Sequence, residues 1–363
     1  MARQPLSPKN MFMKARIRPR GTLPEWPTQP NARGTELVID QKLITDLHGW
    51  SALNKPLPPG SLSIIIVSWN TRELLENCLR SLLANAPGSP FEIWVVDNAS
   101  TDDSPRMVRE KFHQVHLVEN RENMGFARAN NQAIKQCSGK YVLLLNPDTL
   151  AGAGALQALI DLLDTHPEAG AAGARILNPN GSLQISSHPR PTVSRELWRL
   201  FHLDVLSAFS VYPLSKWETT QPQEVDVLMG ACLLLRKEVL DQVGLLDEDY
   251  FIYSEEVDLC YRIQRAGWHL YWVPTAEVVH FGGQSTQQVP TEMFLHLYRS
   301  KIKYFRKHYG WTASQIYKLI LRLAALSRLM LAPFVIFENS ARRRKHLVLV
   351  DRYWRLVLAL PGM

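Results

Sequence analysis

The sequence predicts an α/β fold in which a mostly parallel β-sheet is covered by helices on both faces. Three short apolar runs, at residues 62–67, 92–97 and 141–145, are typical of strands that are buried on both sides. After the first run, apolar residues recur at helical spacing at positions 74, 75, 78, 79, 82 and 83. Strands that alternate with helices form right-handed crossovers, and these produce a parallel sheet.

The remaining elements follow in chain order. In the first half we expect a short strand at 115–118 and helices at about 71–85, 104–112, 127–137 and 153–165. In the second half we expect strands at 225–235, 269–273 and 276–279, and helices at 236–243, 255–266 and 292–308. Residues 178–224 have little periodicity, and we interpret them as a mobile acceptor loop.

Composition and length favour a globular protein with one large domain or two. The chain has 363 residues, of which 46% are hydrophobic and 21% are charged, and this excludes global disorder or a fibre. We expect an N-terminal extension over 1–60, partly disordered, an α/β domain over 61–311, and a basic helical region over 312–363. The four scattered cysteines include no CxxC pair, which argues against a cysteine-based zinc site and fits a cytosolic protein. The N-terminus has no apolar segment of the kind found in signal peptides, so we expect no secretory signal.

The charge is unevenly distributed along the chain. The formal net charge of +7 divides into +6 over residues 1–35, −11 over 36–298 and +12 over 299–363. An acidic middle argues against a nucleic-acid binder, whose folded core should share the basic surface. Basic ends suit a protein that docks on an anionic membrane, although tails that only increase solubility are the alternative.

Polar clusters follow three of the predicted strands. They are Ser68-Trp69-Asn70, the run from Asp97 to Asp102, and Asn146-Pro147-Asp148. In a parallel α/β sheet, ligands bind beyond the carboxyl ends of the strands. Each cluster alone is equally well explained as a turn or a helix cap. Three clusters on consecutive strands, two of them with acids, indicate a binding site.

Three further features carry chemistry. Gly125, in Asn123-Met124-Gly125-Phe126, would let the backbone approach a ligand closely, or would simply form a turn. Glu255 and Glu256 open a helix, where an acid is stabilised by the helix dipole. A carboxylate held there stays ionised and is able to accept a proton from an attacking hydroxyl. His280 is a ligand candidate if Asp148 binds a metal.

Taken together, these segments resemble glycosyltransferase family 2, the inverting enzymes with the GT-A fold. The similar segments are, in chain order, IIIVSWN, VVDNASTDDS, ENMGFARANNQ, YVLLLNPD, the MGA at 229–231, FIYSEEVDLCYR, and a His 24 residues after Glu256. The resemblance runs from about residue 62 to 310, and it is strongest to bacterial rhamnosyltransferase-like members that build surface polysaccharides.

The resemblance implies a set of binding residues. Asp97 would hydrogen-bond the pyrimidine base of the donor. Asp148, the one acid left of the family's DxD-type motif, and His280 would hold Mg²⁺ or Mn²⁺ against the donor's diphosphate. The other residues that the resemblance places in the nucleotide pocket are Ser68, Trp69, Asn70, Asn123, Gly125 and Asn146. Part of the acceptor site would be formed by Met229, Gly230 and Ala231.

The resemblance also implies the catalytic base. Glu255-Glu256 occupies the family's Glu-Asp motif, in which the second acid deprotonates the acceptor hydroxyl. Here Glu replaces Asp at 256, and a carboxylate shifted by about 1 Å can cost roughly a hundredfold in rate. Either the backbone compensates or Glu255 acts instead. The hydroxyl would displace the nucleoside diphosphate in one step, which inverts the anomeric configuration.

The C-terminal region predicts a basic amphipathic helix at 313–331. Ser314, Lys318, Arg322 and Arg328 fall on one narrow stripe opposite a wide apolar face. Internal arginines make spanning a bilayer costly, at about 2.5–3.5 kcal/mol each near its centre, so a helix in the membrane interface is favoured. Residues 342–345 (RRRK) would add contacts to an anionic leaflet. The alternative is a helix that packs on the catalytic domain or on a partner chain.

The sequence therefore predicts a peripheral glycosyltransferase on the cytoplasmic face of a bacterial inner membrane. Its expected partners are a nucleotide-sugar such as dTDP-rhamnose, a saccharide or lipid-linked acceptor, and the anionic membrane surface, with no nucleic acid. A homo-oligomer stays open. A non-catalytic nucleotide-sugar-binding scaffold of an envelope assembly is the alternative, because of Glu256 and the single-acid metal motif. A nucleotidyltransferase is disfavoured, since no Gly-rich loop with Arg or Lys follows the first strand.

Overall fold

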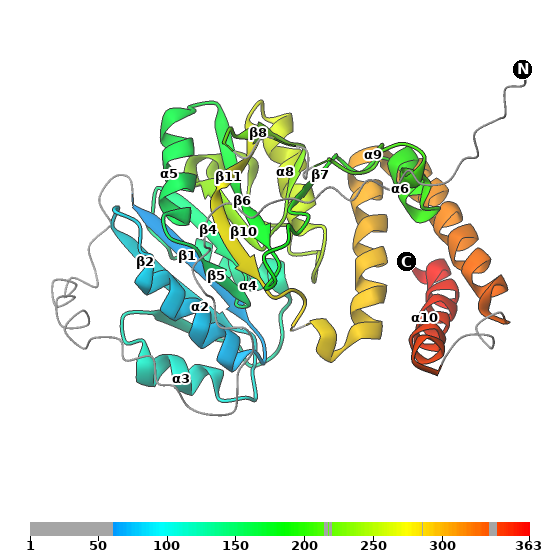
Figure 1. The fold of residues 1–363 in the computed structure, drawn as a ribbon, viewed down its shortest axis with the longest axis horizontal. Helices are drawn as coiled ribbons and strands as arrows, with labels where there is room; N and C mark the ends of the chain where they lie inside the picture. Colours follow the sequence, from blue (N-terminus) through cyan, green and yellow to red (C-terminus); the bar gives the residue numbers. More distant parts are fainter. Residues whose placement is uncertain (1–60, 214–216, 218–219, 285, 334–339) are drawn as a thin grey trace, which may run out of the picture. The chain divides into compact units, whose positions relative to one another are not determined.

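The computed structural model describes residues 61–213, 217, 220–284, 286–333 and 340–363 (Figure 1). The predicted N-terminal extension and the linker before residue 61 lie outside the described residues.

The described residues form a mostly parallel sheet of nine strands, as the sequence predicts. Eight of them follow the order β3 (His116–Glu119), β2 (Phe91–Asp97), β1 (Leu62–Ser68), β4 (Tyr141–Leu145), β10 (Cys232–Arg236), β6 (Ala169–Leu177), β11 (His269–His280) and β5 (Thr149–Ala151), and β8 (Gln223–Glu224) pairs with β11. Strands β3, β2, β1 and β4 are parallel, and so are β6 and β11. β10 is antiparallel to both of its neighbours, β4 and β6.

The sheet separates two hydrophobic cores. One core contains buried residues of α2 (Arg72–Ala84), α3 (Ser104–Lys111) and α5 (Ala155–Thr165). The other contains residues of α4 (Phe126–Ile134), α7 (Lys237–Val243), α8 (Glu255–Arg265) and α9 (Pro290–Met330). Along β1, Ile64 and Ile66 belong to the first core, whereas Ile65 and Val67 belong to the second. This alternation explains the nearly continuous apolar run, because both faces of the strand are buried.

Several predicted boundaries are wrong. The expected strand at 225–235 is broken into β9 (Val227–Leu228) and β10 by residues 229–231. β11 continues through Pro274, and its register shifts between Val273 and Glu277, because proline cannot donate a hydrogen bond to the ladder. The helix expected at 127–137 ends at Ile134. Residues 178–224 are not only a loop: Thr192 accepts a hydrogen bond from the Arg195 amide and caps α6 (Val193–Leu200).

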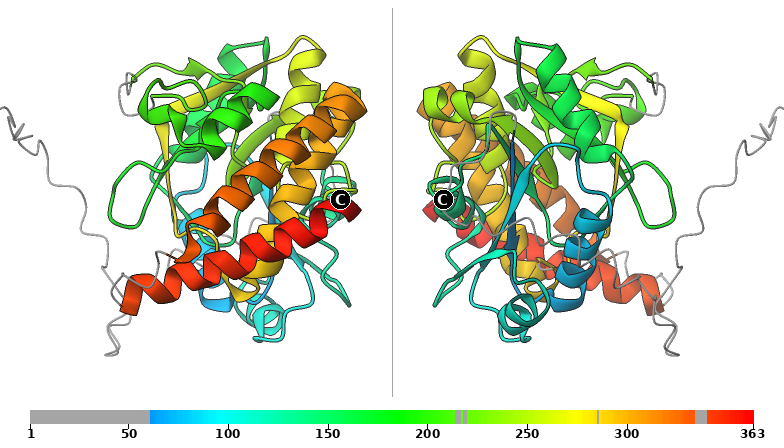
Figure 2. Two further views of the ribbon diagram at one scale, coloured as in Figure 1. Left: turned by 90° about the vertical axis from the view of Figure 1, so that its right-hand side faces the viewer. Right: turned by 90° about the vertical axis from the view of Figure 1, so that its left-hand side faces the viewer.

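The C-terminal helices pack against the fold through one face. In α9, Gly310 has a φ of +87° and breaks the helical geometry, so the helix changes direction there. Beyond it, Tyr317 and Leu321 are buried in the same core as residues of α8, together with Leu356 of α10 (Ser340–Ala359). Figure 2 shows α10 lying against α9. This face of α9 therefore packs on the domain, which is the alternative that the sequence left open beside membrane contact.

The other face of these helices is exposed and apolar. Within α9 it presents Ile316, Leu319, Leu323 and Met330, and within α10 it presents Leu347, Trp354 and Leu358. Among the described residues, no helix combines the length and the hydropathy needed to cross a bilayer.

Candidate active site

A cavity of about 110 Å³ opens at the carboxyl ends of β1 and β4. Three residues predicted for the site line it, namely Trp69, Asn146 and Asp148. Asn98 and Phe126, which belong to two of the predicted site segments, also line it, as do Gly283 and Gln284, which the sequence analysis did not single out. Gly283 and Gln284 follow His280, the last residue of β11, so their position at a strand end was the available signal.

Asp148 and His280 meet beside this cavity. His280 Nε2 lies 3.2 Å from Asp148 Oδ1 and 3.3 Å from Asn146 Nδ2. The other ring nitrogen, Nδ1, lies 2.7 Å from Oε1 of Gln184. When Nδ1 carries the ring proton and donates to Gln184, the electron pair of Nε2 faces the Asp148 carboxylate. This donor set of a carboxylate and a neutral imidazole fits a divalent cation. No group of three or more His, Cys, Asp or Glu side chains that would hold a metal is found in the described part of the chain.

Asp97 lies behind the cavity and does not line it. Its Oδ2 accepts a hydrogen bond of 2.9 Å from the Ser100 amide, whereas its Oδ1 is buried and has no partner among the described residues. Burial raises the pKa of the Asp97 carboxyl. A buried acceptor without a partner is costly, so Oδ1 is available to an N–H group of a ligand. Ser68 is also buried, and its hydroxyl lies 3.0 Å from that of Thr71.

Asn98 holds the loop that contains Asn123 and Gly125. Its side-chain amide donates to Asn123 Oδ1 at 3.0 Å and to the Gly125 carbonyl at 3.2 Å. Asn123 and Gly125 therefore lie in the second layer around the cavity rather than on its wall.

Gly125 makes a close approach, although not to a ligand. Its φ is +83°, and a Cβ atom there would lie 2.4 Å from the carbonyl oxygen of Phe251. That same oxygen accepts a hydrogen bond of 2.7 Å from the Phe126 amide. The glycine thus lets the loop before α8, which leads to the two glutamates, pack against the start of α4.

Asn70 joins three segments at the mouth of the cavity. Its backbone φ is +51°, its amide donates to Ser100 Oγ at 2.9 Å, and its Oδ1 accepts from the Thr101 amide at 2.7 Å. Its carbonyl accepts a hydrogen bond of 3.0 Å from Gln288. We refer to residues 281–289, between β11 and α9, as the connecting segment. Asn70 therefore fastens the connecting segment to the ends of β1 and β2.

Glu255 and Glu256 begin α8 and do not line the cavity. Burial raises the pKa of both carboxyls, and the charge of Glu256 raises that of Glu255 further. Backbone amides at the helix start act in the opposite direction on Glu256, as the sequence predicts, but burial outweighs them. One carboxylate oxygen of each residue is buried without a partner among the described residues. The raised pKa values make the pair stronger bases than ordinary glutamates.

The 229–231 turn adjoins this pair. A Cβ on Gly230 would lie 3.7 Å from the Cβ of Glu256 and 3.9 Å from the ring of Phe126. The Met229 amide donates to the Ser186 carbonyl at 2.9 Å, and the Ala231 carbonyl accepts from the Asn146 amide at 3.0 Å. The turn therefore bridges Asn146 on one side and Glu256 on the other.

A buried ion cluster that the sequence analysis missed lies behind Glu256. Lys301 Nζ of α9 lies 2.9 and 3.0 Å from the two carboxylate oxygens of Glu196 in α6, and Arg199 also contacts Glu196. Burial lowers the pKa of Lys301 to about 8. The charge of Lys301 also lowers the pKa of Glu256, which opposes the effect of burial there.

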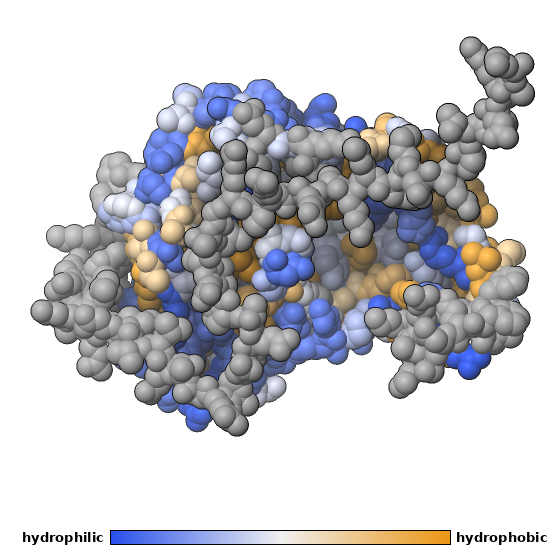
Figure 3. Space-filling view, viewed as in Figure 1, coloured by the Kyte–Doolittle hydropathy of each residue, from blue (hydrophilic) through white to orange (hydrophobic). Residues whose placement is uncertain are grey.

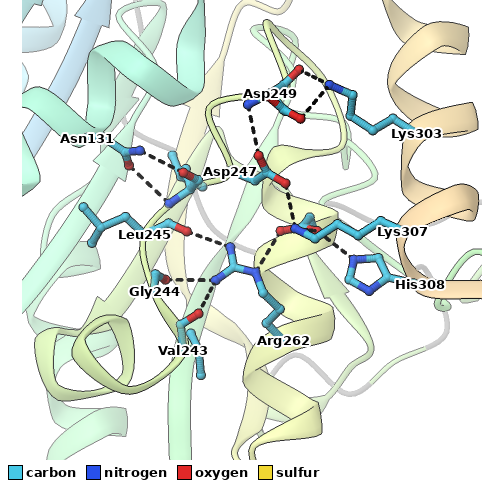
Figure 4. A network of polar contacts seen from close by, with 12 residues as sticks. Asn131, Val243, Gly244, Leu245, Asp247, Asp249, Arg262, Lys303, Lys307 and His308 are labelled. Atoms are coloured by element: carbon cyan, nitrogen blue, oxygen red, sulfur yellow. Dashed lines mark hydrogen bonds and ion pairs between the residues drawn. The ribbon is translucent and has the colours of Figure 1, made fainter. Parts of the chain in front are cut away.

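A second network holds α8 in place (Figure 4). Asp258 is completely buried, and its carboxylate contacts Arg262, Lys307 and His308 at 2.8, 2.7 and 2.6 Å. Burial alone would raise the pKa of Asp258, but these three partners outweigh it and lower the pKa to about 2. Arg262 in turn donates to the carbonyls of residues 243–245. The network fixes the helix that carries the two glutamates.

Comparisons with known proteins identify relatives of this chain. A family model described as glycosyl transferase family 2 matches residues 63–244. An N-acetylglucosaminyl-diphospho-decaprenol L-rhamnosyltransferase of Mycobacterium tuberculosis is 32% identical over 312 residues, which cover 80% of this chain and 98% of that protein. A low-salt glycan biosynthesis hexosyltransferase of Haloferax volcanii is 26% identical over 223 residues, 60% of this chain and 66% of that protein. A solved mannosyltransferase from Pyrobaculum calidifontis, in complex with GDP-Man and Mn²⁺, has a TM-score of 0.50 and 20% identity, covering 88% of this chain and 93% of that chain. This last likeness supports the fold alone.

Proposed function

The chain belongs to glycosyltransferase family 2 and is a glycosyltransferase, and from that premise we propose that it transfers rhamnose from dTDP-rhamnose to a lipid-linked saccharide. The observation that carries the proposal is that Asp148, which lines the cavity, pairs with His280, while Glu256 adjoins Gly230, which in turn faces Phe126 on the wall of the same cavity. The name of the mycobacterial relative supports both the sugar and a lipid-linked acceptor. The product would contribute to a bacterial cell-surface polysaccharide.

Glu256 is the general base in this proposal. Burial raises the pKa of both carboxyls, so the pair readily shares one proton, and we assign the remaining negative charge to Glu256 because it adjoins the 229–231 turn. Glu256 then accepts the proton of the acceptor hydroxyl, which is positioned by the 229–231 turn. The hydroxyl attacks the anomeric carbon opposite the leaving diphosphate, and the single displacement inverts the configuration. A carboxyl with a raised pKa beside the 229–231 turn favours an enzyme over a non-catalytic scaffold.

Asp148 and His280 would hold a divalent cation, Mg²⁺ or Mn²⁺, whose other ligands come from the donor and from water. When bound, the metal supplies positive charge that offsets the charge developing on the leaving diphosphate. Gln184 keeps the ring of His280 in the tautomer that presents Nε2 to Asp148. The Asp97 carboxylate would accept a hydrogen bond from the pyrimidine base, because its Oδ1 is buried without a partner among the described residues.

The exposed apolar face of α9 and α10 would contact the membrane. Figure 3 shows hydrophobic residues on the surface over the C-terminal part of α9. Arg322 and Arg343 are exposed near these residues in the sequence, which suits an anionic surface. The stripe predicted from Ser314 to Arg328 does not form this surface as a whole: Ser314 is buried, Lys318 contacts the carbonyl of Met363, and Arg328 donates to that of Leu200 at 2.6 Å.

We keep the division into a catalytic part, residues 61–311, and a membrane-associating part, residues 312–363. The two parts share a core, because Tyr317 and Leu321 lie among residues of α8. The protein would act on the cytoplasmic face of the membrane, where nucleotide-sugars are made.

A panel of nucleotide-sugars tests the donor. Thermal unfolding is followed with each nucleotide-sugar in the presence of Mn²⁺, since a ligand that binds only the native state raises the midpoint. We expect dTDP-rhamnose to protect most, and to support transfer to a GlcNAc-diphospho-polyprenol. Protection by another donor with no transfer of rhamnose would contradict the proposed sugar.

A further inference from the structure

A second cavity, of about 240 Å³, lies between α9 and α10. Pro290, Met293, Phe294 and Leu297 form one wall, at the spacing of a single helix face. Tyr253, Gln287 and Arg352 complete the lining. We refer to it as the α9–α10 cavity.

The lining combines an apolar wall with a cation. Arg352 comes from α10, and its Nε atom is shielded from solvent and bonds to no group of the described residues. A shielded guanidinium nitrogen without a partner is costly, and phosphate oxygens are the acceptors that suit it best. Met293 and Leu297, on the opposite wall, offer only apolar contact. The chemistry of the cavity therefore fits an anionic amphiphile, in which a phosphate is joined to a hydrocarbon chain.

The α9–α10 cavity and the donor cavity lie on the two sides of the connecting segment. Gly283 and Gln284 of this segment line the donor cavity, and Gln287, four residues after Gly283, lines the α9–α10 cavity. Tyr253 stands three residues before the proposed base, Glu256.

The loop before Glu256 is also tied directly to α9. Ser300 Oγ donates to the Ile252 carbonyl at 2.9 Å, and the rings of Phe251 and His296 stack with centroids 4.8 Å apart. The wall of the α9–α10 cavity and the loop that carries the base are therefore one packed unit. A ligand held in this cavity contacts the same packed unit that carries the proposed base.

We propose that the α9–α10 cavity binds the diphosphate and the first part of the hydrocarbon chain of a polyprenyl-diphosphate acceptor. Arg352 pairs with a phosphate, and the face of α9 from Pro290 to Leu297 contacts the chain. This inference rests on the proposed function, because it places the lipid of that acceptor.

The test measures binding of farnesyl diphosphate, below its micellar concentration, to the full chain by isothermal titration calorimetry. We expect wild-type protein to bind it more tightly than either farnesol or inorganic diphosphate, because only farnesyl diphosphate has both parts. Arg352→Gln should weaken binding about tenfold or more, since a charge-assisted hydrogen bond is lost. Arg355→Gln is the matched control, because Arg355 lies on the same helix, is exposed and pairs with Asp351 at 2.9 Å. It should bind as the wild type does.

Two outcomes overturn the inference. One is equal affinity of wild type and Arg352→Gln for farnesyl diphosphate, and the other is binding of farnesol or inorganic diphosphate as tight as that of farnesyl diphosphate. Each variant is also assayed for hydrolysis of dTDP-rhamnose and for its unfolding midpoint. If wild type turns over the donor while Arg352 has no effect on farnesyl diphosphate, only the lipid subsite is wrong. If farnesyl diphosphate binds through Arg352 but no nucleotide-sugar is ever turned over, the proposed function is wrong.

Discussion

His280 Nε2 lies 3.2 Å from Asp148 Oδ1, although Asp148 lies in the turn between β4 and β5 and His280 ends β11. The pairing of β5 with β11 brings them together, because Thr149 lies opposite His280 in the antiparallel ladder. The Phe281 amide also donates to the Asp148 carbonyl at 2.9 Å. The backbone therefore holds this pair together.

Removing a metal ligand should abolish turnover. Asp148→Ala deletes the one carboxylate next to His280, so we expect no Mn²⁺-dependent binding of dTDP-rhamnose by calorimetry and no transfer. Gln184→Ala leaves both ligands in place but releases the His280 ring, so the Mn²⁺ concentration needed for half-maximal activity should rise roughly 10–100-fold. Full activity of Asp148→Ala, or of wild type in excess EDTA, would remove the metal from the reaction.

Replacing the base should slow turnover without weakening donor binding. Glu256→Gln keeps the shape but cannot accept a proton, so kcat should fall by about 10²–10⁴. Burial raises the pKa of Glu256, so the protonated form persists to a higher pH than in an ordinary glutamate. The acid limb of the wild-type kcat profile should therefore lie above the usual glutamate range. If Glu255→Gln is inactive and Glu256→Gln is active, the roles of the two residues are reversed.

Adding a methyl group at Gly125 should disturb the loop that carries the base. A Cβ there would lie 2.4 Å from the Phe251 carbonyl oxygen, so the loop must move. We expect Gly125→Ala to lower the free energy of unfolding by about 1–3 kcal/mol and to reduce kcat. Gly181→Ala is the control, because Gly181 also has a positive φ of +77° but no atom within 4 Å of the added Cβ. If both variants lose the same free energy of unfolding, the effect at Gly125 comes from backbone strain alone and not from the contact with Phe251.

The sequence predicted the positions of the strands and of their polar ends better than it predicted the contacts between distant segments of the chain. Apolar runs located β1, β2 and β4, since both faces of each strand are buried, and the polar clusters after β1 and β4 do line the donor cavity. β6 was not predicted, because its AGAAGAR sequence lacks the branched residues typical of strands. The role of Gly125 also depended on a contact with Phe251, 126 residues away, which no local pattern reveals.

The C-terminal helix shows why an apolar pattern alone is ambiguous. The wide apolar face predicted for 313–331 divides into two parts. One part, which includes Tyr317, is buried in the core, and the other, which includes Leu319 and Leu323, is exposed. Ser314 falls on the polar stripe of the helical wheel, yet it is buried, with its hydroxyl donating to the Trp311 carbonyl at 2.7 Å. Only tertiary contacts distinguish the two sides.

Breaking the Asp258 network should destabilise the protein in a pH-dependent way. Asp258→Asn leaves Arg262, Lys307 and His308 without their shared carboxylate, so we expect a loss of about 3–5 kcal/mol at pH 7. The folded-state pKa is lowered to about 2, so this stability is present above the unfolded pKa, near 3.9, and is lost as the pH falls toward 2.

The check is chemical denaturation of wild type and variant from pH 2 to pH 7. The difference between them should be constant above about pH 5 and should shrink below pH 4. Asp351→Asn, which removes an exposed partner of Arg355, should show little difference at any pH. A gap between wild type and Asp258→Asn that does not change with pH would contradict the assignment of the lowered pKa.

The exposed face of α9 should bind anionic vesicles. Leu323 is 51% exposed and lies next to the exposed Arg322, so insertion of this face would bury apolar surface while the arginine meets phosphate. Leu323→Asp puts a negative charge on that face and should weaken co-sedimentation with phosphatidylglycerol vesicles at least tenfold, even at low salt, because burying a leucine contributes about 1.5–3 kcal/mol. The unfolding midpoint should not change, since the side chain is outside the core.

Ile185→Asp, at an equally exposed apolar residue outside the C-terminal helices, should co-sediment as wild type does. Salt should weaken the binding of wild type, because part of the attraction is electrostatic. If wild type stays in the supernatant with anionic vesicles, the exposed face has another partner, and sedimentation equilibrium without lipid would then show whether that partner is a second copy of the chain.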